Sequence, residues 1–210
     1  MKKFWFLFLV LSSLLSFAQK SDNERILEDS RNLLFAIDNK DYDTVLDFTY
    51  PVVFQLASRD VLKGLFQMAF EGNEQLKMEF LNLKSVTEFK LSEIYSSADN
   101  SKYAFVSFPM QMRMILNGDL DKDQQSGLIQ SLREQGMIAK FENSNTIFID
   151  KQSITVALNN SHTDGLWKYI NFDENNAAFS RLIPNEVMSK LIKYNAELMQ
   201  MQKDSAVKNK

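Results

Sequence analysis

A run of alternating apolar residues, from Lys102 to Leu116, constrains the fold of this chain more than any other stretch. Its even-numbered positions from Ala104 onward are all apolar. A period of two predicts a β-strand with one buried face. Fifteen residues at about 3.3 Å each would span roughly 50 Å, so we expect the strand to bend within a small domain. Pro109 has no N–H to donate, which predicts a bulge or an edge position in the middle of the strand.

Three helices are predicted ahead of this strand. Each has a capping residue and an apolar stripe, and together they cover residues 21–40, 41–50 and 58–72. Ser21 and Glu24 form a capping box at the start of the first helix. Pro51 disfavours helical geometry at the residue before it and ends the second.

Beyond the third helix the apolar period changes from about 3.6 to 2, which indicates a β-meander. We expect strands at 76–80 and, less regularly, at 86–94. After the long strand we expect an inserted helix near 122–136, short strands at 146–150, 153–158 and 166–172, and a final helix that Pro184 opens. The sequence therefore predicts an α+β domain with a curved antiparallel sheet.

The first eighteen residues have the pattern of a signal peptide. Lys2 and Lys3 precede an apolar run, and Ser16 and Ala18 are small residues before Gln19. We expect cleavage after Ala18, a periplasmic or secreted protein, and no membrane attachment once the signal is removed. The segments are then a signal peptide at 1–18, a single domain at 19–204 and a disordered polar tail at 205–210.

Composition excludes several classes of function. Without Lys2 and Lys3, 22 basic side chains remain against 27 acidic ones, a net charge of −5, so the chain lacks the basic surface that nucleic acids need. It has no Cys, hence no disulfide and no thiolate chemistry. His162 is the single histidine, and one imidazole cannot form a multi-histidine metal site. We therefore expect no metal and no cofactor, and we interpret His162 as an exposed turn residue.

Two short motifs carry a resemblance to a known family. The sequence Lys40-Asp41-Tyr42-Asp43 lies between the first two helices, and the closing strand reads Gly165-Leu166-Trp167-Lys168-Tyr169-Ile170. With the order of elements over residues 22–175, they resemble the nuclear transport factor two-like superfamily, which includes the ketosteroid isomerases and polyketide cyclases. The resemblance implies three N-terminal helices packed in the concave face of a strongly curved antiparallel sheet, around a conical pocket. The insertion at 122–136 and the helix after 184 are additions to that minimal fold.

The layout is also similar to secreted proteins common in the Bacteroidetes, a likeness that implies no activity. Our leading hypothesis is an exported, non-enzymatic domain that binds a small apolar ligand or a partner protein. Met110, Met112 and Met114 share the buried face of the long strand, and we interpret them as core in preference to pocket wall. Four aromatic residues are predicted to line or flank the mouth of the pocket: Tyr50, Phe54, Phe105 and Trp167.

Two alternatives remain open. One is an isomerase or cyclase of the ketosteroid isomerase type, with Asp47 or Glu93 as the base and Tyr50 as a hydrogen-bond donor, although none of these matches the catalytic motif of that family. The other is a structural homodimer in which a second copy covers the sheet.

Overall fold

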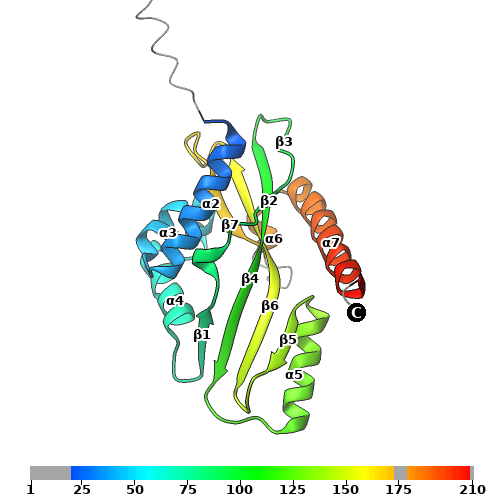
Figure 1. Ribbon diagram of the computed structural model, residues 1–210. Helices are drawn as coiled ribbons and strands as arrows, with labels where there is room; N and C mark the ends of the chain where they lie inside the picture. The colour runs from blue at the N-terminus through cyan, green and yellow to red at the C-terminus, as the bar shows by residue number, and fades with distance from the viewer. Residues whose placement is uncertain (1–19, 173–178, 209–210) are drawn as a thin grey trace, which may run out of the picture.

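Two long antiparallel strands, β4 (Lys102–Leu116) and β6 (Thr146–Asn159), form the centre of this α+β protein (Figure 1). The computed structural model describes residues 20–172 and 179–208. In these residues one antiparallel sheet is ordered β1-β4-β6-β5, with β2 and β3 also pairing with β4, and β7 with β6. The shorter strands are β1 (Leu76–Phe80), β2 (Lys90–Leu91), β3 (Tyr95–Ser96), β5 (Ile138–Phe141) and β7 (Lys168–Asn171).

The helices precede, interrupt and follow this sheet. They are α2 (Asp22–Asp38), α3 (Tyr42–Phe48), α4 (Arg59–Glu71), α5 (Lys122–Glu134), α6 (Phe179–Leu182) and α7 (Asn185–Lys208), with short 3-10 helices η1 (Pro51–Gln55) and η2 (Leu83–Ser85). The predicted capping box is confirmed: Glu24 N–H donates to the Ser21 hydroxyl, and Ser21 N–H donates to the Glu24 carboxylate. The predicted inserted helix and C-terminal helix are α5 and α7.

The β4–β6 ladder is longer than the sequence predicts. Residues 102–115 pair with 146–159 without a break, so the two short strands expected at 146–150 and 153–158 form one strand. Lys151 and Gln152, which suggest a turn, continue the ladder opposite Met110 and Pro109. Both are half-buried, so polar side chains are tolerated there without a break in pairing. Strand β5, which pairs with β6, was not predicted.

Pro109 lies where one edge of β4 has no neighbouring strand. Strands β2 and β1 pair with different parts of β4 and leave residues 108–111 between them. The Asn82 side chain fills this gap: its Nδ2 donates to the Pro109 carbonyl oxygen at 3.2 Å, and its Oδ1 accepts from Gln111 N–H at 2.9 Å. The N–H and C=O of one residue point to the same side of an antiparallel strand, so the missing donor of Pro109 faces the gap. The edge position predicted from the sequence is therefore local, in a strand that is otherwise central.

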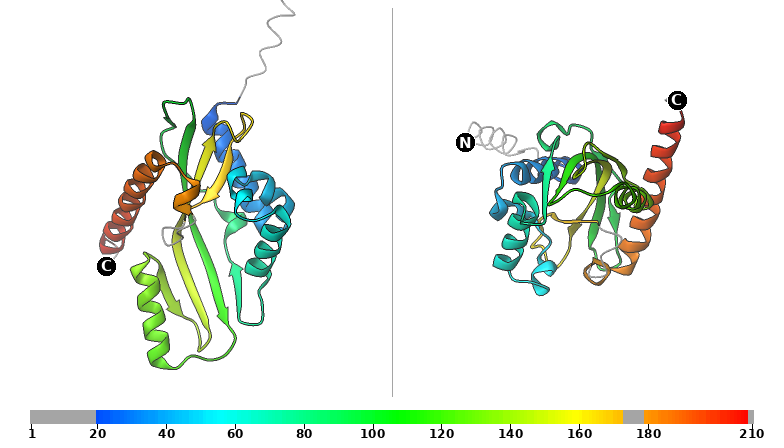
Figure 2. Two further views of the ribbon diagram at one scale, coloured as in Figure 1. Left: turned by 180° about the vertical axis from the view of Figure 1, so that it is seen from behind. Right: turned by 90° about the horizontal axis from the view of Figure 1, so that it is seen from below.

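Helices cover both faces of the sheet (Figures 1 and 2). The face that carries the even-numbered residues of β4, here the inner face, packs Ala104 and Val106 against Ile26 of α2. The opposite, outer face packs Phe105 against α7, where Leu191 is fully buried. The sequence predicts burial of one face only, whereas the first half of β4 is buried on both.

The far end of the inner face is covered by α5. Leu132 of this helix packs against Met112 and Ile149, and Met114 joins the same cluster. The outer face at this end carries Arg113, which is ion-paired with Glu142 and partly exposed.

Helix α7 extends to Lys208, so residues 205–208 are helical although a disordered tail was expected there. Neither Pro nor Gly occurs in this segment to end the helix. The predicted signal peptide, 1–18, and the last two residues lie outside the described residues. No helix in the described ranges is long and apolar enough to cross a membrane.

Packing against α7 gives a test of the outer face. Phe105→Ala should lower the free energy of unfolding by about 3–5 kcal/mol, because it removes a fully buried ring and leaves a cavity. Arg113→Ala, on the same face of the same strand, should leave the free energy of unfolding nearly unchanged, because its ion pair with Glu142 is accessible to solvent. Urea unfolding measures both, and equal losses would contradict the two-sided burial of β4.

Candidate functional site

A cavity of about 570 Å³ lies between the helices α2–α4 and the inner face of the sheet. These helices stand on one side of the sheet and α7 stands on the other, as both views in Figure 2 show. Apolar side chains dominate the lining; the principal ones are Leu33, Leu34, Ile37, Val45, Phe48, Leu62, Phe66, Phe70, Met78, Phe80, Phe108, Met110 and Met112. The cavity is thus a place where the helical layer covers the sheet without filling the space above it.

Helix α4 forms one wall of the cavity. Its lining residues Leu62, Phe66 and Phe70 recur at helical spacing, and the Phe70 ring meets the Phe80 ring of β1 edge-on at 5.3 Å between centroids. No residue of α4 is fully buried, and a second apolar stripe that includes Leu65 is exposed to solvent. Helix α4 therefore closes the cavity with little packing of its own.

The floor of the cavity combines apolar and polar residues of two paired strands. Phe108, Met110 and Met112 come from β4, so two of the three methionines interpreted as core also line the cavity. Strand β6 adds Lys151, Ser153 and Thr155, which occupy alternate positions and therefore share the inner face.

Two of these polar side chains are deeply buried. Ser153 is 3% exposed and donates a hydrogen bond to Asn171 Oδ1 at 3.2 Å. Thr155 is 6% exposed, and its hydroxyl makes no hydrogen bond within residues 20–172 and 179–208. Lys151 is the only charged side chain among the described lining residues, and it already takes part in an interaction within the protein.

Tyr169 links the cavity to a carboxylate behind it. Its ring lines the cavity, and its hydroxyl donates to Asp29 Oδ2 of α2 at 2.9 Å. Burial raises the pKa of Asp29, although the hydrogen bond from Tyr169 opposes that change. Burial, together with the Asp29 charge, raises the pKa of Tyr169. Asp29 does not line the cavity, so the pair acts as an anchor between α2 and β7 and presents no carboxylate to a ligand.

None of the four aromatic residues expected at the pocket mouth lines this cavity. Phe105 is on the outer face under α7. Trp167 is 4% exposed, and its Nε1 donates to Asp22 Oδ1 at 3.1 Å, which places it in the core beside α2. Phe54 lies in η1, where its neighbour Val53 lines the cavity instead. Tyr50 is buried, accepts a hydrogen bond from Asn160 Nδ2 at 2.9 Å, and lines a different hollow.

The two carboxylates considered as catalytic bases also lie away from the cavity. Asp47 is exposed at the surface of α3 and ion-paired with Arg59 at 2.7 Å. Glu93 is exposed in the loop between β2 and β3, close to Tyr95 on the α7 side of the sheet. The structure does not bring Asp47, Glu93 and Tyr50 together around one reacting centre.

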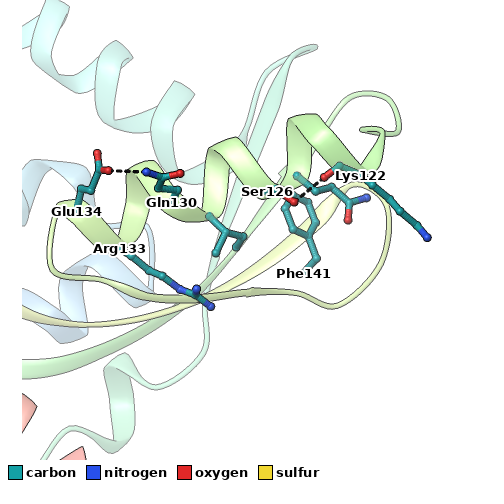
Figure 3. Close-up of a pocket in the computed structure, with 8 residues that line it drawn as sticks. Lys122, Ser126, Gln130, Arg133, Glu134 and Phe141 are labelled. Atoms are coloured by element: carbon teal, nitrogen blue, oxygen red, sulfur yellow. Dashed lines mark hydrogen bonds between the residues drawn. The ribbon is translucent and has the colours of Figure 1, made fainter.

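Two other hollows are less suited to a ligand. The hollow that Tyr50 lines, of about 560 Å³, also contains Glu186, whose carboxylate accepts from Tyr103 Oη at 3.0 Å and Ser97 Oγ at 3.2 Å. The second is a groove beside α5, where most side chains come from one flank of a single helix and Phe141 comes from β5 (Figure 3). Its Gln130 and Glu134 bond to each other, and Arg133 points away from them. Neither hollow is lined by apolar side chains to the extent that the cavity is.

The sequence contained a signal for the polar floor. Ser153 and Thr155 alternate with the apolar Ile154 and Val156, a period of two that assigns them to one face of a strand. Which face lies toward the helices depends on the register with β4, and the sequence pattern does not give that register.

Comparisons with protein-family models, with curated proteins and with solved structures find no match to this chain. The case for a function therefore depends on the geometry of the cavity.

The Asp29–Tyr169 contact predicts a dependence of stability on pH. Because the pKa of Asp29 is raised above its ordinary value of 3.8, its contribution to stability is present below that pH and is lost as pH rises through the raised pKa. Asp29→Asn keeps an acceptor for Tyr169 but cannot ionise, so the free energy of unfolding of the wild type should fall relative to this variant over that range. Urea unfolding at a series of pH values measures the difference.

Asp29→Ala is the matched variant, because it removes the acceptor and leaves the Tyr169 hydroxyl without a partner. It should cost about 1–3 kcal/mol relative to Asp29→Asn at neutral pH. Equal stability of the two variants would show that the hydrogen bond contributes nothing.

Proposed function

We propose that this protein binds a small apolar molecule in the cavity between α2–α4 and the inner face of the sheet. The observation that carries the proposal is the largely apolar, partly open cavity of about 570 Å³, lined by side chains from helices on one side and strands on the other. Pockets for small molecules are commonly about 300–1,000 Å³ and are lined mostly by apolar and aromatic groups with few polar ones.

The energetics favour an occupant. An apolar molecule would cover side chains that are incompletely packed, and burial of apolar surface contributes about 25 cal/mol per Å². Phe48, Phe66 and Phe108 offer large contact areas at a low cost in side-chain entropy. An apolar ligand would also supply the contacts that α4, without a buried residue, lacks in the empty protein.

The resemblance to the nuclear transport factor two-like superfamily is consistent with this proposal, since that fold implies a pocket between its helices and a concave sheet. An isomerase or cyclase is less well supported, because no carboxylate is among the described residues that line the cavity. A homodimer through the sheet is also less well supported, because α7 occupies the outer face over Tyr103 and Phe105.

Ligand binding can be tested with Nile red, a neutral dye that fluoresces in apolar surroundings. We expect the wild-type protein to bind the dye and octane to displace it. A ligand at about a hundred times its dissociation constant should raise the free energy of unfolding by about 2.7 kcal/mol, which thermal unfolding measures.

Two variants of α4 provide a matched control. Leu62→Trp places a larger side chain in the cavity and should weaken dye binding by about tenfold, or about 1.4 kcal/mol. Leu65→Trp places the same side chain on the exposed side of the helix and should leave binding unchanged. Failure of the wild type to bind either probe, or an equal effect of the two variants, would contradict the proposal.

We also propose that the protein acts outside the cytoplasm, from the signal-peptide pattern of residues 1–18. Mass spectrometry of the protein recovered from the periplasm or medium should give an N-terminus at Gln19. Recovery with an intact Met1 would contradict this.

A further inference from the structure

We propose that the ligand carries an uncharged oxygen, a hydroxyl or a carbonyl, that hydrogen-bonds to the Thr155 hydroxyl on the floor of the cavity. This inference rests on the proposed function and specifies the chemistry of the ligand.

The Thr155 hydroxyl is the exception among the buried polar side chains. Within the described part of the chain, the others each have a hydrogen-bond partner: Ser30 with Ile26 O, Ser107 with Tyr194, Thr146 with Asn145, Ser153 with Asn171, and Thr163 with Asn160. Thr155 has none, although it is 6% exposed and lines the cavity. Among the described residues no enclosed side-chain nitrogen or oxygen atom lacks a hydrogen-bond partner, so the Thr155 hydroxyl oxygen keeps some accessible surface. The hydroxyl is therefore available to a molecule in the cavity that Thr155 lines.

Strand structure alone does not require a hydroxyl at this position. Valine has nearly the same shape, favours strands equally and carries no polar atom to desolvate. The Thr155 hydroxyl oxygen keeps some accessible surface, so water can reach it when the cavity is empty. An oxygen atom delivered by a ligand would take the place of that water and give the hydroxyl a hydrogen-bond partner.

The surrounding groups define what the oxygen atom can be. The Thr155 hydroxyl can donate to a ligand carbonyl, or both donate to and accept from a ligand hydroxyl. Ser153, two residues away on the same face, gives its proton to Asn171 and retains lone pairs that can accept from a ligand hydroxyl. Two adjacent hydroxyls therefore form a small polar spot in an apolar lining.

The occupant should be uncharged. Hydroxyl groups cannot neutralise a buried ion, and an unpaired charge in an apolar cavity is strongly disfavoured. Lys151, the only charged side chain among the described lining residues, already has an interaction partner. The ligand class is therefore an apolar molecule with one neutral oxygen function, such as a medium-chain alcohol or ketone.

Displacement of Nile red by octanol and by octane provides the test. Octanol has the oxygen atom and octane does not, so the comparison is made for each ligand between wild type and variant. Thr155→Val should weaken octanol binding by about fivefold to tenfold, the value of one net hydrogen bond, and leave octane binding unchanged. Thr155→Ser keeps the hydroxyl and should bind octanol like the wild type. Thermal unfolding establishes that both variants fold.

The outcomes separate the two proposals. If octane displaces the dye but octanol binds equally well to the wild type and to Thr155→Val, the hydrogen bond is overturned and apolar binding stands. The same conclusion follows if Thr155→Val weakens the binding of both ligands equally. If neither octane nor octanol displaces the dye, both proposals are overturned. Octanoate binding more tightly than octanol at neutral pH would overturn the uncharged head group.

Discussion

The β4–β6 ladder needs a hydrophobic cover on both of its faces, and this requirement organises the rest of the protein. In the first half of β4 every residue from Tyr103 to Phe108 is buried, so neither face can be left to solvent. Helix α7 supplies the outer cover, and α2 with α5 supplies the inner one. The inner cover is shared by helices that meet the sheet at different places, and the cavity lies where α2, α3 and α4 cover the sheet without filling the space above it.

Polar contacts hold the helical layer at its distance from the sheet. At one end of α2, Asp22 accepts from Trp167 Nε1 and pairs with Lys102, and these contacts lower the pKa of Asp22. Further along the helix, Asp29 accepts from Tyr169. Helix α4 is connected to α3 through an ion pair between Arg59 and Asp47, and it adds no buried residue to the core. Such directional anchors fix the position of the helices without requiring that every apolar surface between them be filled.

Local patterns in the sequence predicted the elements, whereas the site depended on long-range placement. The period of two in β4 and the capping box at Ser21 are encoded within a few residues, and both predictions are confirmed. Phe105 was expected at the mouth of a pocket, but α7, far away in the sequence, buries the face of β4 on which it lies. Thr155 was not singled out, because an unpaired hydroxyl can be recognised only when all its neighbours are known.

Side chains at alternate positions of β6 contact different parts of the protein. Ile154 and Val156 pack toward α7, while Ser153 and Thr155 face the cavity. Deletion of a single residue in the strand would exchange the two sets and bring hydroxyls under α7 and branched aliphatic side chains to the floor. Loss of two residues would shorten the strand yet keep each remaining side chain on its own face. In proteins related to this chain, β6 should therefore tolerate insertions or deletions of two residues. Insertions or deletions of a single residue should be confined to the loops at its ends.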